Sequence, residues 1–532
     1  MITYRFSSLV TFSFCFVCLL HQAASAQNKS KDIPVRVELE KSAGKSPVTA
    51  NRQSVIHTHG TDWVMRGRDH TRNPVSPDKN APTDWKIGST FNKQRPKNVL
   101  WSVKLGTVSC GDPVIANGLV WVGTNNDHPR DPKNSGNASV LMCFRERDGK
   151  FLYQYVSPRL VERSRLDWSS TSLASSPLVE GDRLWFCNNR CETICLDIGP
   201  LHRATGQPRV LWKVDMRREL GVVPCGVMIG SNANHCSIAA YKDLIYVNTT
   251  NSSHAGKVPA PDAPSLVCFQ KKTGKVVWKD NSPGENILDV QFGSPLVIAS
   301  KGRGQVIMGQ GDGWLRSFDS RTGKLLWKFD INFKSPKRKF TYNGKHNYFV
   351  ATPVFYKNRV YIASGRHRDH SKEHGRLCCI DVTKRGDISS ELDDGSGRGK
   401  TNPNSGLVWD FVKRGDKPED RMHGSLSSVA VHDSLVFAPD ATGLIHCLDA
   451  ETGKKYWTAD SFSGIYASPL IADKKVYVAN EDGIVFIYEL AKQRKLLAER
   501  DFNNSIESSP VFANNVLYVM SRRVLHAIKS QK

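Results

Sequence analysis

A six-residue motif returns along this chain and constrains its fold more than any other feature. Thr-Gly-Lys followed by two further residues and Trp occurs three times, ending at Trp278, Trp327 and Trp457. Weaker copies, in which a glycine precedes an aromatic residue, end at Tyr153 and Trp212. A motif that returns along a chain is the mark of a repeat architecture, in which each copy forms one supersecondary unit.

The sequence between the copies follows one order of signals. A Ser-Pro pair comes first, as at Ser176, Ser468 and Ser509, and is followed by two short apolar segments separated by a polar turn. A third segment, such as Leu444 to Asp449, alternates apolar and polar residues as a half-buried strand does. Gly, Asn and Asp at the turns supply the positive φ of tight hairpins. One unit is therefore four short strands.

The ends of the units set the size of the repeat. The shortest spacings are 41, 48 and 49 residues, a period at which four strands form a propeller blade. The last unit stops after three strands, and residues 98–104, which carry Trp101, are expected to supply the fourth. We therefore predict an all-β, eight-bladed propeller of four-stranded antiparallel blades, closed by an N-terminal strand that joins the C-terminal blade. The residues that end the units are Trp101, Tyr153, Trp212, Trp278, Trp327, Trp409, Trp457 and, in a degenerate copy, Ala498.

With these motifs the chain resembles the pyrroloquinoline-quinone-like repeat family over residues 98–530. That family includes quinoprotein dehydrogenases and the periplasmic propeller of outer-membrane barrel assembly. The resemblance implies that the Trp of one blade docks on the glycine-containing turn of the next, where a buried indole supplies apolar area and one N–H donor. The expected blade-docking residues are Trp278, Trp327, Trp457, Gly274, Gly323 and Gly453.

Residues 1–26 have the order of a secretory signal peptide. Arg5 precedes an apolar run from Leu9 to Leu20, and Ala24-Ser25-Ala26 forms a small-residue cleavage site. The run is shorter than the ~20 residues of a membrane-spanning helix. We expect cleavage after Ala26, a polar linker over residues 27–60, an N-terminal extension over residues 61–97, and a soluble periplasmic or secreted protein without a transmembrane segment.

The chain carries a formal charge of +23. Such an excess favours anionic partners through long-range attraction, although dispersed lysines on solvated turns also simply keep an exported protein soluble. The excess is dispersed, with residues 337–339 as the only compact basic run. No nucleic acid partner is expected. An envelope protein or an anionic polymer remains as the expected partner.

Eleven cysteines follow the signal peptide, an odd number, so at least one is unpaired within the chain. The pair Cys378-Cys379 resembles the adjacent-cysteine disulfide of quinoprotein alcohol dehydrogenases. The repeat register favours buried thiols instead, because adjacent strand residues point to opposite faces and Cys379 aligns with a cysteine in four other units. Those four cysteines are Cys143, Cys195, Cys268 and Cys447.

The motifs of a quinoprotein enzyme are not recognisable in this sequence. It has no Cys-x-x-Cys-His haem motif, and the catalytic aspartate, calcium ligands and quinone-contacting arginine of the family find no match. We therefore assign no catalytic residue and no cofactor. The leading hypothesis is a non-catalytic exported binding or scaffold protein of the cell envelope; the alternative is a dehydrogenase of alcohols or sugars that uses pyrroloquinoline quinone and calcium.

An insertion in the fifth unit, residues 365–375, is the most chemically dense segment. His367, His370 and His374 are candidate ligands of a metal such as zinc. Arg366, Arg368 and Lys372 in the same segment would repel a cation, so a solvated loop without metal is the competing hypothesis.

Insertions at the equivalent place of the first and third units cover residues 124–139 and 249–264. Equivalent connections of a propeller emerge on one face, so these loops are expected to form a shared partner-binding face. The competing explanation is that insertions are merely tolerated at exposed tips. On a shared face the histidines, which include His128 and His254, would gain charge below a pH of about 6.5 and strengthen the binding of anionic ligands.

Overall fold

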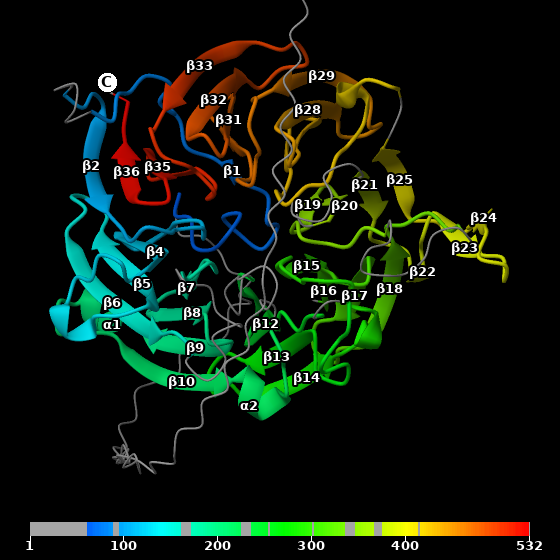
Figure 1. Cartoon of the computed structure of the whole chain (residues 1–532), viewed down its shortest axis with the longest axis horizontal. Coiled ribbons are helices and arrows are strands. Elements are labelled where there is room, and N and C mark those ends of the chain that lie inside the picture. The colour runs from blue at the N-terminus through cyan, green and yellow to red at the C-terminus, as the bar shows by residue number, and fades with distance from the viewer. Residues whose placement is uncertain are drawn as a thin grey trace, which may run out of the picture. The chain divides into compact units, whose positions relative to one another are not determined.

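The computed structural model describes residues 61–88, 95–160, 172–224, 236–253, 256–300, 303–335, 346–366, 375–412 and 415–530. These residues form a ring of eight four-stranded antiparallel sheets (Figure 1). The predicted all-β, eight-bladed propeller is therefore confirmed. We name the sheets blades A to H in the order of their first strands.

Each blade runs from its innermost, first strand to its outermost, fourth strand. Blade A consists of β3 (Val114–Ala116), β4 (Leu119–Asn125), β5 (Ala138–Arg145) and β6 (Phe151–Pro158), and blade B of β7 (Leu178–Glu180), β8 (Arg183–Cys187), β9 (Glu192–Asp197) and β10 (Arg209–Asp215). Blade C consists of β11 (Ala239–Tyr241), β12 (Leu244–Asn248), β13 (Leu266–Gln270) and β14 (Val276–Asp280), and blade D of β15 (Leu296–Ser300), β16 (Arg303–Gly309), β17 (Trp314–Asp319) and β18 (Leu325–Asp330). Blade E consists of β19 (Val354–Tyr356), β20 (Arg359–Ser364), β21 (Arg376–Asp381) and β25 (Leu407–Phe411), and blade F of β26 (Ala430–His432), β27 (Leu435–Pro439), β28 (Leu444–Asp449) and β29 (Lys455–Asp460). Blade G consists of β30 (Leu470–Ala472), β31 (Lys475–Ala479), β32 (Ile484–Glu489) and β33 (Leu496–Asp501), and blade H of β34 (Val511–Ala513), β35 (Val516–Met520), β36 (Val524–Ile528) and β2 (Val99–Lys104).

Helices are few and short among the described residues: α1 (Gly199–His202), α2 (Met216–Leu220) and the 3-10 turns η1 (Pro132–Asn134), η3 (Gly284–Asn286) and η4 (Pro418–Asp420). None of them is long and apolar enough to cross a membrane. The structure is thus built almost entirely from its strands.

Blade H takes strands from two distant parts of the chain. β2 pairs antiparallel with β36, with Ser102 opposite His526, while β34 and β35 complete the sheet. The Ser102 hydroxyl and the His526 Nδ1 atom lie 2.8 Å apart. One sheet therefore depends on residues near both limits of the described chain.

Every blade has a β-bulge between its third and fourth strands. The register shifts at the residue just before the unit-ending residue, as at Leu211 before Trp212 and Leu326 before Trp327. A bulge leaves one residue without a partner on the neighbouring strand. The unpaired residues in blades A to H are Leu152, Leu211, Val277, Leu326, Val408, Tyr456, Leu497 and Leu100.

The cysteine alignment is confirmed by this register. Cys379 lies opposite Trp409, and the other four aligned cysteines each lie opposite the unit-ending aromatic of their own blade. Cys378 and Cys379 belong to different apolar clusters, one on each side of β21. Both are free buried thiols, as the alternation of side chains along a strand requires.

The serines of the Ser-Pro pairs, and the residues that replace them in other blades, form hydrogen bonds between adjacent blades near the centre of the ring. Two residues before the first strand of each blade stands a Ser, Thr or Asp, and its side-chain oxygen accepts a hydrogen bond from the backbone N–H of the equivalent residue in the preceding blade. Seven of the blade junctions carry such a bond, with lengths from 2.7 to 3.1 Å. The residues are Asp112, Ser176, Ser237, Ser294, Thr352, Ser428, Ser468 and Ser509. We call them the hydroxyl ring.

Residues 61–79, which we call the hub segment, cross the centre of the propeller (Figure 1, dark blue) and bond to all eight blades. Backbone bonds reach the first strands of blades A, B, E and G, and β1 (Val75–Ser76) pairs parallel with β30. The Asn73 amide exchanges two bonds with Val431 in blade F, and Asp78 accepts from the backbone N–H of Asn515 in blade H. The inner edges of the sheets are thereby covered by the chain itself.

Arg72 extends the hub segment to blades C and D. Its guanidinium donates to the carbonyls of Ser237 and Ile238, at 3.0 and 2.9 Å, and to that of Pro295 at 3.1 Å. A fourth bond goes to the carbonyl of Arg66. Arg72 is 2% exposed, and this burial lowers its pKa to about 9. Three buried carbonyls and one partly buried carbonyl therefore depend on one side chain.

The degenerate copy in blade G is completed from outside the repeats. Ala498 stands where other blades have an aromatic residue, and Trp85 packs into the same apolar cluster with Phe502. The hydroxyl of Tyr477 donates to the carbonyl of Pro82, as that of Tyr246 in blade C donates to the turn of the next blade. Residues 81–88 thus occupy the place of a neighbouring blade's turn.

The propeller has two different faces, because strands alternate in direction. The turn face carries the tight turns between first and second strands together with the hub segment: Asp62 accepts from the N–H of Asn117, and Asp78 from that of Asn515, both in such turns. The loop face carries the connections between second and third strands and those between blades. Between the third and fourth strands of blade E, β22 (Gly386–Asp387), β23 (Glu391–Asp393) and β24 (Gly399–Thr401) form an excursion at the outer rim (Figure 1).

Candidate binding site on the loop face

The three predicted insertions all connect second and third strands, and the strand ends that flank them point to the loop face. They cover residues 126–137 in blade A, 249–265 in blade C and 365–375 in blade E. His128 is exposed there, whereas the Arg130 guanidinium lies over the rings of Phe144 and Phe151.

The histidines on which the metal hypothesis depends, His367, His370 and His374, lie outside the described residues, as does His254. Within the described part of the chain, no three His, Cys, Asp or Glu side chains are grouped to hold a metal ion. The metal site and the contribution of these histidines to binding stay predictions.

The predicted blade-docking residues lie at the junctions between blades. The indole of Trp278 donates to the carbonyl of Ser320 at 3.0 Å, and a Cβ added at Gly323 would come within 2.7 Å of the same ring. Gly274 and Gly453 stand in the same way against Trp212 and Trp409. At these three glycines φ is near +70°, so a side chain is disfavoured both by the backbone and by the ring.

Trp457 also donates to the turn of the next blade, at the carbonyl of Ala491 and 3.1 Å. Trp327 differs, because its indole donates to the side chain of Gln305 within its own blade and its backbone pairs with Gly386 of β22. The contribution of these residues to stability stays a prediction.

A hollow of about 480 Å³ opens on the loop face between the outer strands of blades A and B. The end of β6 forms one wall, the turn before β9 forms the floor, and the end of β10 with α2 forms the other wall. The lining residues are Tyr155, Val156, Ser157, Pro158, Arg190, Glu192, Lys213, Asp215, Arg218 and Glu219.

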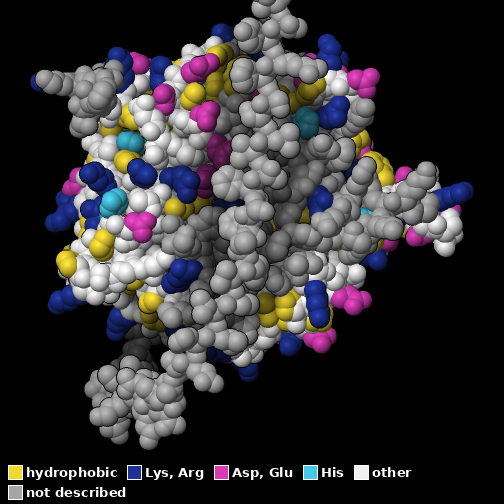
Figure 2. Space-filling model, in the orientation of Figure 1, with side chains coloured by type: hydrophobic (Ala, Val, Ile, Leu, Met, Phe, Trp, Pro, Cys, Tyr) yellow, Lys and Arg dark blue, Asp and Glu magenta, His cyan; other side chains and the backbone are white. Residues whose placement is uncertain are grey.

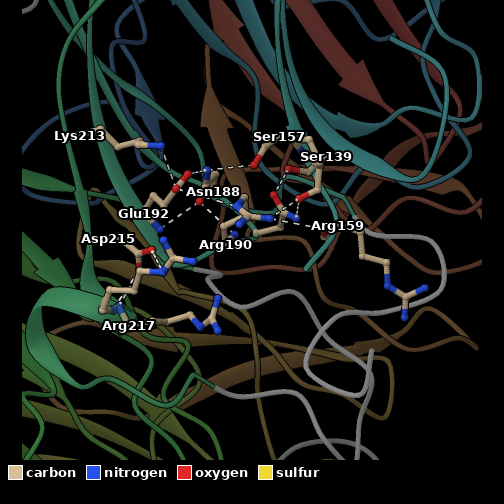
Figure 3. A network of polar contacts seen from close by, with 12 residues as sticks. Ser139, Ser157, Arg159, Asn188, Arg190, Glu192, Lys213, Asp215 and Arg217 are labelled. Atoms are coloured by element: carbon tan, nitrogen blue, oxygen red, sulfur yellow. Dashed lines mark hydrogen bonds and ion pairs between the residues drawn. The ribbon is translucent and has the colours of Figure 1, made fainter. Parts of the chain in front are cut away.

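Asn188 organises the floor of this hollow (Figure 3). Its amide oxygen accepts from the backbone N–H groups of Arg190 and Glu192, which shapes the turn. Its amide nitrogen donates to Ser157 at 2.9 Å and to the Glu192 carboxylate at 2.6 Å. Blades A and B are therefore linked through one side chain whose four polar contacts are all made.

The carboxylates of the hollow are held by fixed partners. Glu192, with its side chain 8% exposed, also accepts from Lys213 at 3.0 Å. Asp215 caps α2 by accepting from the N–H groups of Arg217 and Arg218, and Glu219 accepts from the N–H of Asp215. Their charges are thus engaged within the protein.

The cations of the hollow remain accessible. The side chains of Arg190, Lys213 and Arg218 are 27%, 45% and 72% exposed. Burial, with the nearby Glu192 as a smaller cause, raises the pKa of Tyr155 to about 12, so its phenol stays neutral. The arrangement suits an anionic group, which would meet two exposed cations over a floor of satisfied polar groups. On the face shown in Figure 2, Lys and Arg side chains are otherwise spread around the rim among acidic ones.

None of these hollow residues was identified from the sequence. Asn188, Glu192 and Lys213 belong to different strands and turns of blade B and carry no motif, and the second wall comes from blade A. The available signal was the Asp215–Glu219 spacing at the start of a helix, which indicates a cap and not a binding site.

The centre of the ring offers little room for a quinone at the level of the hydroxyl ring. The cavity between that ring and the hub segment measures about 10 Å³, which is about the space of one water. Arg66 fills this region and lies 3.5 Å from the Asp112 carboxylate. The residues at this position therefore do not fit the cofactor. Cys378 and Cys379 do not line this cavity, and both are free thiols.

Comparison with known families gives a match over more than half of the chain. Residues 209–396 and 398–496 match the model described as outer membrane protein assembly factor BamB. A quinoprotein ethanol dehydrogenase of Pseudomonas putida is 32% identical over 101 residues, which cover 19% of this chain and 15% of that enzyme. A quinone-dependent 1-butanol dehydrogenase of Thauera butanivorans is 25% identical over 125 residues, which cover 22% and 17%. The chain therefore spans less than a fifth of the length of these curated relatives.

Solved structures share the fold at low sequence identity. BamB of Moraxella catarrhalis is 14% identical, with a TM-score of 0.53 over 81% of this chain and 99% of that one. The quinohemoprotein alcohol dehydrogenase of Comamonas testosteroni is 12% identical, with a TM-score of 0.58 over 89% of this chain and 81% of that one. Both an outer membrane protein assembly factor and an alcohol dehydrogenase therefore have this architecture, and the architecture alone does not choose between them.

Proposed function

Since the chain belongs to the pyrroloquinoline-quinone-like repeat family whose model is described as outer membrane protein assembly factor BamB, we propose that it is a non-catalytic binding protein of the cell envelope. The observation that carries the proposal is the extent of the family match, which covers more than half of the chain. The partner is an envelope protein or an anionic polymer, bound through the loop face.

The contrast between the two faces supports this choice of surface. Hydrogen bonds from the hub segment cover the inner strand edges on the turn face, so that face serves the ring itself. The loop face carries the longer connections and the hollow between blades A and B, where Lys213 and Arg218 are exposed. Recognition resides in loops that a rigid scaffold positions.

A binding assay with an acidic polysaccharide, such as polygalacturonate, tests the role of the hollow. We expect saturable binding by the full chain that weakens as salt is raised. The double variant Lys213→Ala/Arg218→Ala should bind several-fold more weakly. Lys324→Ala/Lys454→Ala removes two exposed lysines from the opposite face and serves as the matched control. Equal loss in both double variants would show that total charge, and not the hollow, attracts the polymer.

The histidines of the blade E insertion are tested in the same assay. Protonation near pH 6.5 should make binding stronger at pH 6 than at pH 8, and the triple variant His367→Ala/His370→Ala/His374→Ala should lose this pH dependence. Equal, salt-insensitive binding by the full chain and the triple variant at both pH values would contradict the proposed role of the loop face.

The alternative, a quinone-dependent dehydrogenase, is favoured by the local similarity to two alcohol dehydrogenases. Adding pyrroloquinoline quinone and calcium to the purified protein separates the two functions. A non-catalytic propeller should show no stoichiometric uptake of the quinone and no dye reduction that depends on alcohol or sugar. Both signals together would replace the binding function by the enzymatic one.

Export is part of the proposal and has its own test. A protein processed after Ala26 begins with Gln27. Intact-mass measurement of the protein recovered from the envelope or the medium should give the mass of residues 27–532. Recovery of the full-length chain from the cytosol alone would contradict the predicted signal peptide.

A further inference from the structure

The fourth strands of the blades form the outer rim of the propeller, and in the described residues seven of them stand at the edge of their sheet. The exception is β18 of blade D, which pairs on its outer side with β22 of the blade E excursion. The pairing is parallel and places Gly386 opposite Trp327 and Asp387 opposite Lys328. The protein thus shows, in one blade, how an extended segment binds to the rim.

The contacts of β22 are of three kinds. The N–H of Ile388 donates to the carbonyl of Lys328 at 2.9 Å, which extends the ladder. The Lys328 ammonium lies 3.8 Å from the Asp387 carboxylate. Ile388 is fully buried in one apolar cluster with Trp327, and the bulge residue Leu326 packs against that cluster. Main-chain bonds, one charge pair and one aliphatic side chain therefore hold the segment.

The outer strand of blade B repeats the sequence of β18 but has no such cover. Leu211-Trp212-Lys213 and Asp215 stand in the places of Leu326-Trp327-Lys328 and Asp330. Trp327 is 0% exposed beneath β22, whereas Trp212 is only partly buried and the bulge residue Leu211 is 42% exposed.

The N–H of the final aspartate is satisfied in both strands, by Ser389 in blade D and by Glu219 in blade B. The two edges thus share their sequence and this satisfied N–H, but Trp212 donates to the turn of blade C whereas Trp327 donates within its own blade. Exposed bulge residues also occur in blades C, E, G and H, but their strands lack the full Leu-Trp-Lys sequence.

We propose that the outer edge of β10 binds an extended segment of a partner protein as an additional parallel strand. The segment carries glycine opposite Trp212, an acidic residue opposite Lys213 and, next to it, an aliphatic residue that covers Leu211. Strand addition to an exposed sheet edge draws its affinity from main-chain bonds and its specificity from alternate side chains. This surface lies on the rim, is separate from the insertions of the loop face, and shares Lys213 with the lining of the hollow.

The probe is a fluorescent peptide with the sequence of residues 384–391, Lys-Arg-Gly-Asp-Ile-Ser-Ser-Glu, titrated with the full chain and followed by anisotropy. We expect saturable binding with one peptide per chain. Leu211→Lys should weaken it about tenfold or more, because a charge replaces a buried aliphatic contact. Phe462→Lys is the matched control, since Phe462 is 87% exposed and lies outside the outer strands.

A charge exchange tests the register. Lys213→Glu should weaken binding of the peptide, and a peptide with lysine in place of its aspartate should regain affinity for that variant alone. A peptide with a photoreactive group in place of its isoleucine should cross-link to β10. The proposal is overturned by the lack of saturable binding, by equal affinity of the Leu211→Lys and Phe462→Lys variants, or by cross-links confined to other strands.

Discussion

The turn face and the loop face are built from the same eight repeats but use their polar groups differently. On the turn face, one buried arginine, Arg72, satisfies four carbonyls, and the hub segment bonds to every blade. On the loop face, Lys213 and Arg218 keep much of their surface exposed although fixed partners hold the acids beside them. The hub segment therefore holds the blades together through bonds that do not involve the long connections of the loop face, so those connections can vary without opening the ring.

The largest effect is expected from cutting the sheet that joins distant parts of the chain. Deleting residues 505–532 removes β34, β35 and β36, so β2 loses its sheet and the hub segment loses its contacts with blade H. Two open edges would result. Thermal unfolding followed by circular dichroism should lose its cooperative transition or shift by well over ten degrees. If the truncated chain melts like the full one, ring closure through blade H is wrong.

Arg72→Met tests the hub segment with a single change. Three buried carbonyls would lose their donor, and each unsatisfied group costs about 1 to 3 kcal/mol, so we expect a loss of about 5 kcal/mol of unfolding free energy in a denaturant titration. Arg218→Met, at the exposed side chain of the loop face, is the matched control and should stay within about 0.5 kcal/mol. Similar losses in both variants would abolish the contrast between the faces.

Trp327→Ala tests the tryptophans between blades and should cost about 3 to 5 kcal/mol, because it empties a large buried site. Trp121→Ala provides the comparison: its ring is also fully buried, in the second strand of blade A, and its indole nitrogen has no hydrogen-bond partner among the described residues. A melting temperature for Trp327→Ala equal to that of the unaltered chain would remove the structural role of this residue.

His526 in blade H should make the stability of the folded protein depend on pH. Burial lowers the pKa of His526 to about 4, below its ordinary value of 6.5. Folding therefore favours the neutral ring, and its contribution is complete above pH 6.5 and is lost as the pH falls from 6.5 to 4, by about 3 kcal/mol in all. In denaturant titrations at pH 7 and pH 4.5, His526→Gln should reduce the difference between the two stabilities. His432→Gln, at a side chain that is 41% exposed, should leave it unchanged.

The smallest effect on stability is expected in the hollow of the loop face. Lys213→Ala/Arg218→Ala removes cations that are themselves 45% and 72% exposed, and Glu192 keeps its bond from Asn188, so the unfolding free energy should change by less than about 1 kcal/mol. Anionic-polymer binding by the same protein should fall several-fold. A large loss of stability would instead place these residues in the cohesion of blades A and B.

The repeat made most of the propeller predictable. The positions of Trp278 and Cys268 carry like residues in other blades, because each blade must present similar side chains to similar neighbours. This repetition revealed the four-strand unit, the count of eight and the shared register of the cysteines. The candidate site was not predictable in the same way. Ser157, Asn188 and Lys213 come together only because blades A and B pack side by side.

The sequence by itself determined what repeats: the four-stranded blades, their unit-ending residues and the buried thiols, since periodic local signals report periodic structure. The tertiary structure alone decided what occurs once. Arg72 reaches blades C and D, and Trp85 packs beside Ala498 in blade G, across hundreds of residues and without any motif. The carbonyls that Arg72 bonds and the side chains that surround Trp85 come from distant parts of the chain and are brought together only when the ring forms.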